Sequence, residues 1–307
     1  MFRRPSTAVL DHNLGESHTN IMDAKMDKTG EALKAQRFQM LVDIAEELRG
    51  DIAFPSYFEV TLRLRKALND PNADEKRIAQ LISMEPVIAS KLISVANSVA
   101  YNAAGHNVRD LLGAIARLGL RTVHSIAVQV AMKQMLQAKD MACFGDFAEK
   151  LWKHSLQTAA YAEVIAERLT RLNSNEVRMM GLIHDLGAFY MLYRAAHYEE
   201  LRARPDTVRH LTVQWHESIG ESLLQALGFD EEFVAATSNH DQPRTVPYPP
   251  RTLADILYVA NLLAGGPYVL LPDDIEADGR RAELGEDYLA LEPEMAAKLA
   301  EITASFA

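Results

Sequence analysis

The chain has very little cysteine, because Cys143 is the single thiol among 307 residues. One thiol cannot close a disulfide within the chain, and it cannot build the cysteine clusters of structural zinc sites. Nothing beside Cys143 suggests an activated nucleophile, so we interpret it as a small core or surface residue. The low cysteine content therefore excludes a disulfide-stapled scaffold and a zinc-thiolate protein.

Long apolar runs and excess basic charge are also lacking. No run approaches the ~18 apolar residues of a membrane span, and residues 1–20 lack the apolar segment of a signal peptide. The chain has 32 Lys and Arg against 42 Asp and Glu, so its formal net charge is −10. This charge disfavours bulk attraction to nucleic acid or to an anionic membrane. We therefore expect a cytoplasmic protein that neither inserts into a membrane nor binds nucleic acid directly.

Two common catalytic motifs and β structure are missing as well. The sequence contains no Gly-rich phosphate loop and no Gly-x-Ser-x-Gly nucleophile elbow. It also shows no convincing strand alternation and no internal repeat. What is present is a globular composition, with 48% hydrophobic and 24% charged residues. Apolar residues recur three and four positions apart, which predicts an all-α protein.

The predicted helices follow one another from Glu31 onwards. Their ends are placed by caps and breakers, as where Asn72 precedes Glu75 and where Gly119 separates two helices. Asn173 resembles the cap of a helix that we expect to end at Gly187. Beyond residue 50 the expected helices span residues 57–68, 72–82, 87–99, 108–118, 122–136, 151–169, 174–187, 213–227, 231–240, 252–264 and a last segment from 293.

Composition divides the chain into four parts. Residues 1–30 are polar and aperiodic, which predicts a mobile tail. Residues 31–140 form an N-terminal helical half, and residues 146–265 form a second helical half. Residues 266–307 make an acidic segment that ends in a helix. All the candidate metal ligands lie in the second half.

These candidates gather around the dipeptide His184-Asp185. Imidazole nitrogen and carboxylate oxygen suit Zn, Fe, Mn or Ni without any thiolate. Neighbouring helical residues lie ~100° apart, but both can reach one ion beyond the helix end, where Gly187 lets the chain turn. His154, His216 and His240 stand on three other predicted helices. Any one of them alone is more often an ordinary core or surface histidine, so both interpretations stay open.

Three stretches of the chain follow a known pattern. The first runs from Met84 to Ser98 with Tyr101 following, and the second is Ala114–Gly119. The third combines residues 152–155, 181–187 and 216–220. Together, over about residues 50–262, they resemble the HDOD domain, the HD-related output domain of bacterial signalling proteins in the HD superfamily of metal-dependent phosphohydrolases. Glu85 stands where this family usually has Asp.

The resemblance implies a multi-helix HD-like bundle with an N-terminal helical subdomain, and a divalent metal such as Mn, Fe, Zn or Mg. The ligands that it implies are His154, His184, Asp185, His216, His240 and Asn261. Asn261 stands where the family has its distal Asp, and an amide oxygen can coordinate a metal but brings no charge. Asp255, six residues earlier, is the poorer substitute because it points ~120° away. Asp241 stands where the related HD-GYP phosphodiesterases have a second His.

The resemblance favours a non-catalytic signal-transduction module that binds a signalling protein or a small nucleotide. The alternative is a metal-dependent phosphohydrolase or phosphodiesterase acting on a nucleotide or cyclic dinucleotide, and whether the chain is an enzyme stays open. The residues Asn97, Ser98 and Tyr101 are candidate ligand or partner contacts, although capping and packing also explain them. Arg117 and Arg121, near His124, can bind an anion or simply form a solvated helix face.

Overall fold

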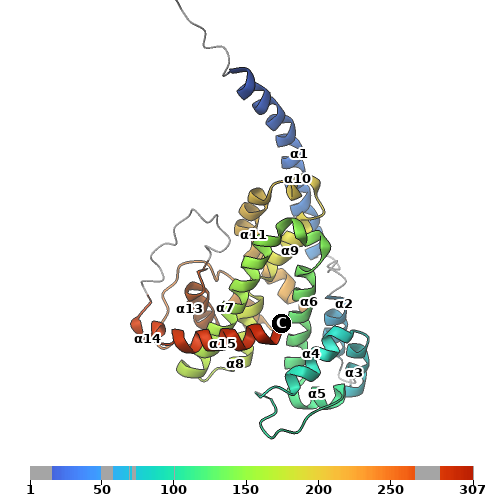
Figure 1. The fold of residues 1–307 in the computed structure, drawn as a ribbon, viewed down its shortest axis with the longest axis vertical. Helices are drawn as coiled ribbons and strands as arrows, with labels where there is room; N and C mark the ends of the chain where they lie inside the picture. The colour runs from blue at the N-terminus through green and yellow to red at the C-terminus, as the bar shows by residue number, and fades with distance from the viewer. Residues whose placement is uncertain are drawn as a thin grey trace, which may run out of the picture.

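The structure, a computed structural model, describes residues 16–49, 58–68, 70, 74–99, 101–266 and 284–306. Throughout these ranges the regular structure is helical and contains no strand, so the predicted all-α fold is confirmed. Two hydrophobic cores organise the bundle: a smaller one among the helices between residues 59 and 136, and a larger one formed by the remaining helices together with the second half of the helix at residues 120–136. Figure 1 shows the smaller unit, with α2 to α5, beside the lower end of α6.

The N-terminal half packs around its own apolar core. Its helices are α2 (Glu59–Leu68), α3 (Glu75–Ser83), α4 (Pro86–Ala96), α5 (Leu111–Leu118) and α6 (Leu120–Leu136). The predicted break at Gly119 is present, since its φ of 75° suits glycine and the axes of α5 and α6 differ by 111°. The N-cap of α3 is Asp74, which accepts a hydrogen bond from the Arg77 amide. Asn72, the predicted cap, lies outside the described residues.

The second half is a bundle around the long helix α7. Its elements are the 3₁₀ helix η2 (Lys139–Phe144) and the helices α7 (Gly145–Leu169), α8 (Ser174–Ile183), α9 (Leu186–Ala195), α10 (Glu199–Arg202), α11 (Pro205–Leu227), α12 (Glu231–Thr237), α13 (Leu253–Leu263), α14 (Glu286–Leu289) and α15 (Glu292–Phe306). Most of α7 is buried, and α8, α13 and α15 pack against it. The predicted cap Asn173 is confirmed, because its side chain accepts from the amides of Asn175 and Glu176.

One expected boundary is wrong at the place that matters most. The helix that begins after Asn173 ends at Ile183 rather than at Gly187, and His184 is its C-cap. The chain bends at His184-Asp185, and Gly187 lies inside the next helix, α9. The reason is packing: a Cβ at position 187 would lie 2.0 Å from the backbone oxygen of His216 on α11. Gly187 therefore permits close helix contact instead of a turn.

Helix α1 (Glu16–Arg49) starts within the stretch that was expected to be a tail, and its N-terminal part extends away from the bundle (Figure 1). Its C-terminal part is fixed to α9 by buried Met40 and Ile44 and by polar contacts. The Tyr190 hydroxyl donates to Glu47 at 2.5 Å, and Arg194 donates to the same carboxylate at 2.6 Å. The mobility of residues 1–30 and the limits of the four parts stay predictions.

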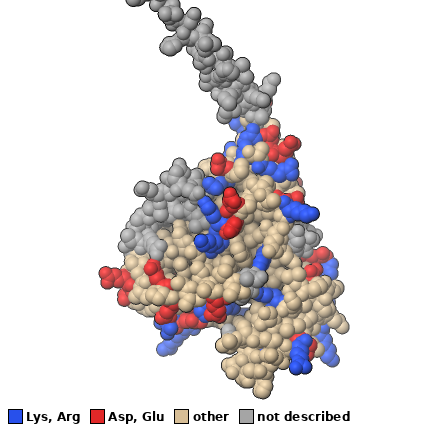
Figure 2. Space-filling view, in the orientation of Figure 1, with Lys and Arg blue, Asp and Glu red and all other residues tan. Residues whose placement is uncertain are grey.

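Surface charge is unevenly spread over the face seen in Figure 2. Acidic side chains gather along α14 and α15, whereas the lobe formed by α4 and α5 shows few charges. Within the described ranges, no helix by itself has the length and apolarity to cross a membrane. The bent pair α5–α6 meets those two criteria when its helices are taken together.

Candidate metal centre

Five side chains from four places in the second half meet in its interior. His154 lies on α7, His184 and Asp185 join α8 to α9, His216 lies on α11, and His240 follows α12. Each of these residues is at most 3% exposed. Two glycines allow this approach, because a Cβ at Gly181 would lie 2.8 Å from the Ala159 Cα, and Gly187 contacts α11 as described above. The helices can therefore bring their polar groups into one small volume.

All four histidines direct Nε2 at the carboxylate of Asp185. His184 Nε2 lies 3.2 Å and His154 Nε2 3.7 Å from Oδ2, while His240 Nε2 lies 3.2 Å and His216 Nε2 3.6 Å from Oδ1. The ligand atoms form two groups, each spanning no more than 4.8 Å: His154, His184 and Asp185, and Asp185, His216 and His240. Asp185 belongs to both groups, so its two oxygens can serve adjacent metal positions.

The opposite ring nitrogen of each histidine meets a backbone carbonyl. Nδ1 lies 2.8 Å from the Gly181 oxygen in His184, and at comparable distances from the Ala264, Thr212 and Thr237 oxygens in the other three rings. A carbonyl only accepts, so each Nδ1 carries the proton. The lone pair of a neutral ring then lies on Nε2, which is the atom that a metal needs. The backbone thus orients all four rings for coordination.

In this arrangement hydrogen-bond acceptors face one another, namely the Nε2 atoms and the Asp185 carboxylate. A neutral Nε2 lone pair facing a carboxylate is unfavourable in a buried site unless a proton or a cation lies between them. In keeping with this, Nε2 of His184 and Nε2 of His216 have no hydrogen-bond partner within the described part of the chain. The donor set of imidazole nitrogens and carboxylate oxygens fits a divalent transition metal.

Without metal, protons have to lie between the imidazole nitrogens and the carboxylates, and the pKa values indicate which groups carry them. Burial would raise the pKa of Asp185, but the charge of His184, together with the hydrogen bond and charge of His240, holds it well below its ordinary value. Burial similarly opposes a charge on His240, yet the adjacent carboxylates raise its pKa to about 10. Burial, together with the positive charge of its neighbour His184, lowers the pKa of His154 to about 4. The metal-free cluster therefore keeps His240 charged and His154 neutral at pH 7.

Asp241 belongs to this cluster, although the sequence analysis did not include it among the ligands. Its Oδ2 lies 3.4 Å from Nε2 of His216, and its Oδ1 lies 3.8 Å from Nε2 of His240. Burial would raise the pKa of Asp241, but the charges of His240 and His216 lower it to about 2. The sequence does carry a signal, because His240-Asp241 repeats the dipeptide His184-Asp185.

Asn261, on α13, holds Asp241 in place. Its Nδ2 donates to Oδ1 of Asp241 at 2.9 Å, while its own Oδ1 is buried with no hydrogen-bond partner among the described residues. An unsatisfied buried oxygen beside the cluster fits the expected role of Asn261 as a neutral ligand. Asp255 is engaged elsewhere, since its carboxylate accepts from Arg244 and caps the start of α13. Its poor suitability as a ligand follows from these contacts.

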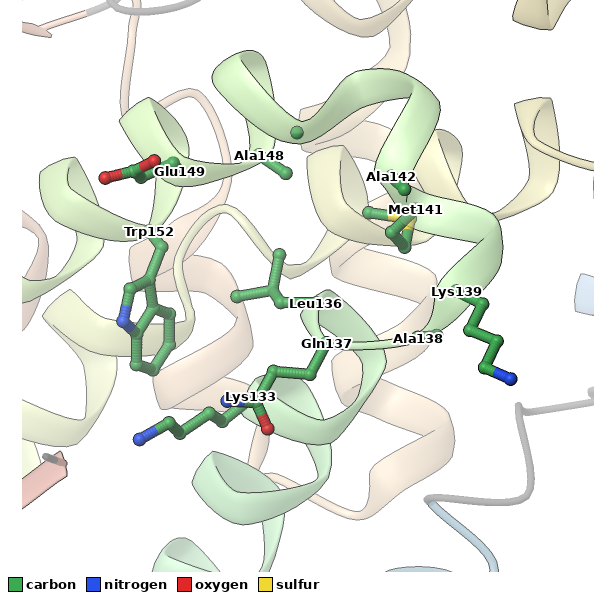
Figure 3. Close-up of a pocket in the computed structure, with 11 residues that line it drawn as sticks. Lys133, Leu136, Gln137, Ala138, Lys139, Met141, Ala142, Ala148, Glu149 and Trp152 are labelled. Atoms are coloured by element: carbon green, nitrogen blue, oxygen red, sulfur yellow. The ribbon is translucent and has the colours of Figure 1, made fainter.

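Three of the cavities in the described part of the molecule lie away from these ligands. One of 340 Å³ lies between α6, η2 and α7; Figure 3 shows Leu136 and Trp152 at its wall and Lys139 pointing away. A second, of 430 Å³, lies between the two halves, and an open one of 510 Å³ lies beside Arg168–Leu172. None of the three is lined by a residue of the His/Asp cluster.

The other candidate contacts have clear structural partners. The Asn97 amide clamps the following loop, donating to the Val108 oxygen at 2.8 Å and accepting from its amide at 2.7 Å. Ser98 donates to the Val95 oxygen, and the Tyr101 hydroxyl donates to Asn175 on α8 at 3.0 Å. Arg117 donates to backbone oxygens of the N-terminal half. Their role in binding a ligand or partner stays a prediction.

An all-helical bundle with a His-Asp pair surrounded by further histidines defines a protein of the HD type. The HDOD domain family model matches residues 54–243, and the chain belongs to this family. A crystal structure from Shewanella amazonensis SB2B, provisionally named a metal-dependent phosphohydrolase, has a TM-score of 0.65 and 22% identity over 89% of this chain and 100% of that one. This similarity shows that the two chains share a fold.

Two further matches are more distant. An HDOD domain protein of unknown function from Geobacter sulfurreducens has a TM-score of 0.48 and 19% identity over 81% of this chain and 93% of that one. An uncharacterised protein of Treponema pallidum (strain Nichols) is 23% identical over 244 residues, which are 75% of this chain and 45% of the relative. The chain thus spans about half the length of this curated relative.

Proposed function

We propose that this chain is a signal-transduction HDOD module that binds a divalent metal in its His/Asp cluster. It acts by binding a signalling protein or a small nucleotide rather than by catalysis, and the cytoplasm is the compartment that we expect. The observation that carries the metal site is the meeting of four Nε2 atoms at Asp185 with every Nδ1 bound to a backbone oxygen. Such a site needs a metal cation or protons between its acceptors.

Burial favours binding over turnover. Asp185 and the four histidines around it are between 1% and 3% exposed, so a substrate has little access to them. A phosphohydrolase has to bring phosphorus and water to its metal. The neutral Asn261 in place of a carboxylate also weakens the hold on a divalent ion. These features suit a metal that fixes the bundle or responds to a partner.

The alternative is a phosphohydrolase or phosphodiesterase acting on a nucleotide or cyclic dinucleotide. One observation supports it: Asp185 is shared by two ligand groups, an arrangement that suits two-metal hydrolysis. A bound divalent cation would polarise a phosphoryl oxygen there. The protein's own contribution would be to fix the ion through His154, His184 and Asp185, and to place Asp241 beside His216.

Metal content is the decisive measurement. After incubation with Mn, Fe, Zn or Mg and gel filtration, elemental mass spectrometry should find about one ion per wild-type chain. His184→Ala should contain at least tenfold less metal, because it removes a buried ligand from the group that His184 forms with His154 and Asp185. His197→Ala is the matched control: its Nδ1 also meets a backbone oxygen, but the ring is exposed. No metal in the wild type, or equal metal in His184→Ala, would refute the site.

Turnover separates the two functions. Metal-loaded protein should leave bis(p-nitrophenyl) phosphate, nucleoside triphosphates and cyclic dinucleotides intact over hours if it acts by binding. Release of phosphate or nitrophenol that scales with enzyme and disappears in His184→Ala would instead establish the hydrolase and overturn the binding proposal, while leaving the metal site itself valid.

A further inference from the structure

The 430 Å³ cavity lies at the junction of the two halves and is built from four segments. Arg65 comes from α2, residues 120–129 from α6, residues 173–179 from the start of α8, and residues 228–233 from the turn between α11 and α12. Its volume falls within the ~300–1,000 Å³ of small-molecule sites. It is separate from the metal ligands, so its use does not depend on the proposed metal function.

One wall of this junction cavity is aromatic. Phe229 is half-buried and stacks on Phe233, with ring centroids 4.7 Å apart and planes inclined by 24°. The His124 ring lies 5.4 Å from Phe229 on the side of α6. Because Phe233 and His124 are buried, Phe229 is the ring of the three that offers an apolar surface to a planar group, and base–aromatic stacking contributes about 1–3 kcal/mol per base.

The polar lining carries excess positive charge. Arg65, Arg121 and Arg178 come from three different helices, against the carboxylates of Glu176 and Asp230. The Asp230 carboxylate already caps α12 by accepting the Phe233 amide. Arg121 is exposed and forms no ion pair within the described ranges, whereas Arg178 is paired with Glu163 at 3.5 Å. In a chain with a net charge of −10, this local excess favours an anion, and a guanidinium suits the paired oxygens of phosphate.

Arg65 is set in position by the backbone around it. Its Nη1 donates to the oxygen of Ala226 near the end of α11. Gly228, with a φ of +86°, leaves room for this side chain, because a Cβ there would lie 2.4 Å from Nε of Arg65. The cation is therefore fixed at the cavity wall before any ligand arrives, which lowers the entropic cost of binding.

His124 adds an unsatisfied polar atom to the same wall. The residue is 8% exposed, and its Nε2 is buried with no hydrogen-bond partner among the described residues. Burial and the nearby Arg65 lower the pKa of His124 to about 4, so the ring is neutral at pH 7 and can accept a hydrogen bond. A ligand that donates an N–H here would satisfy it.

We propose that the junction cavity binds a small aromatic anion of the nucleoside monophosphate class. The base would stack at Phe229 with a donor group toward His124, and the phosphate would meet Arg121 and Arg178 near the start of α8. The Glu176 carboxylate can accept from sugar hydroxyl groups. The aromatic wall, the excess of guanidinium groups and the buried acceptor together favour this class over a simple inorganic anion.

Isothermal titration of the full chain with AMP tests the proposal, with EDTA present so that metal cannot capture the phosphate. AMP should bind at least tenfold more tightly than adenosine or inorganic phosphate. Arg121→Gln and Phe229→Leu should each weaken the binding of AMP at least tenfold. Arg121→Gln removes the exposed cation, and Phe229→Leu removes only the aromatic ring. Arg171→Gln, an exposed arginine at the 510 Å³ cavity, is the matched control and should stay within twofold.

Three outcomes would overturn the proposal. One is an absence of heat and of NMR line broadening with millimolar AMP. Another is AMP binding that is equally strong in Arg121→Gln and Phe229→Leu. The last is binding of adenosine or phosphate alone as tightly as AMP, which would remove either the charge or the ring from the recognition. Circular dichroism on each variant separates lost binding from lost folding.

Discussion

The core between α2 and α6 is almost entirely apolar, running from Val60 to Val130, with Thr61 and His124 as its buried polar side chains. The core of the second half surrounds four histidines, Asp185 and Asn261, all buried. Apolar packing is favourable in every solvent condition near neutrality, at about 25 cal/mol per Å² of apolar area removed from water. A buried polar cluster is favourable only when its charges and acceptors are matched.

The difference assigns separate physical roles to the halves. The N-terminal half is stabilised by packing and by side-chain hydrogen bonds to the backbone from Asn97 and Arg117, so its stability should not depend on metal. The second half contains acceptors that face one another, so its stability should follow metal and proton concentration through linkage. Three predictions test this contrast, from the largest expected effect to the smallest.

Gly187→Ala should cause the largest loss. The added Cβ would meet backbone atoms of His216 and Gly220, at 2.0 and 2.5 Å, so α9 and α11 must move apart. We expect a loss of more than about 4 kcal/mol in unfolding free energy, together with loss of metal. Urea denaturation and elemental analysis measure both.

Gly113→Ala in the N-terminal half is the comparison for this change. Its Cβ would lie 2.6 Å from the Val108 side chain, which can turn aside, and 3.5 Å from Oδ1 of Asp110, so about 1 kcal/mol is expected without loss of metal. Gly145→Ala has open space and should change stability by less than ~1 kcal/mol. Equal losses at 187 and 113 would contradict the contrast between the halves.

Acid should act on the two halves through different histidines. The pKa of His124 is lowered from 6.5 to about 4 by burial, so its neutral form stabilises the fold above pH 6.5 and this contribution disappears as pH falls toward 4. Between pH 7.5 and 4.5, the free energy of unfolding of His124→Gln should therefore fall by about 2.5 kcal/mol less than that of the wild type. Denaturant titrations at the two pH values, with EDTA, measure the difference; parallel profiles would disprove it.

His240 should behave in the opposite way. The pKa of its ring is raised to about 10, so in metal-free protein the stabilisation is fully present below pH 6.5 and disappears as pH rises through 10. Bound metal replaces the proton and should remove this dependence on pH. The same titrations, extended to pH 10 with and without metal, include this check.

Asn97→Ala should have the smallest effect of the three. It removes two hydrogen bonds to the Val108 backbone, while Arg117 still donates to the His106 oxygen of the same loop, so a cost of about 2 kcal/mol is expected. The cost should be equal with metal and with EDTA, because the clamp lies in the apolar half. Ser98→Ala removes an exposed hydrogen bond from the Ser98 hydroxyl to the Val95 oxygen at the end of α4. It should change the free energy of unfolding by less than ~0.5 kcal/mol.

Much of the fold could be predicted because its determinants are local. Apolar spacing and caps such as Asn173 placed the helices, and the break at Gly119 followed from glycine alone. The end of α8 was misplaced because Gly187 has two possible uses, a turn or a close contact. Only the distant partner, the backbone at His216, decides between them. Long-range packing of this kind leaves no periodic signal.

The candidate site shows the same limit. Local geometry explains three of the ring orientations, because His184, His216 and His240 meet oxygens three or four residues earlier. The orientation of His154 depends on Ala264, 110 residues away, and could not be inferred. Asp241 was set aside because it departs from the pattern of related proteins, whereas its contacts with His216 and Asn261 place it in the cluster.

Asn261 also affects how many ions the cluster can hold. The ligand set contains two carboxylates, Asp185 and Asp241, and otherwise neutral imidazole and amide groups. One divalent cation balances these two negative charges. A second cation would leave two positive charges in an interior that is nearly closed to water, which is strongly unfavourable without an anion to accompany it. An amide at position 261 thus makes the second ion conditional on an anion, so that phosphate and metal would enter together.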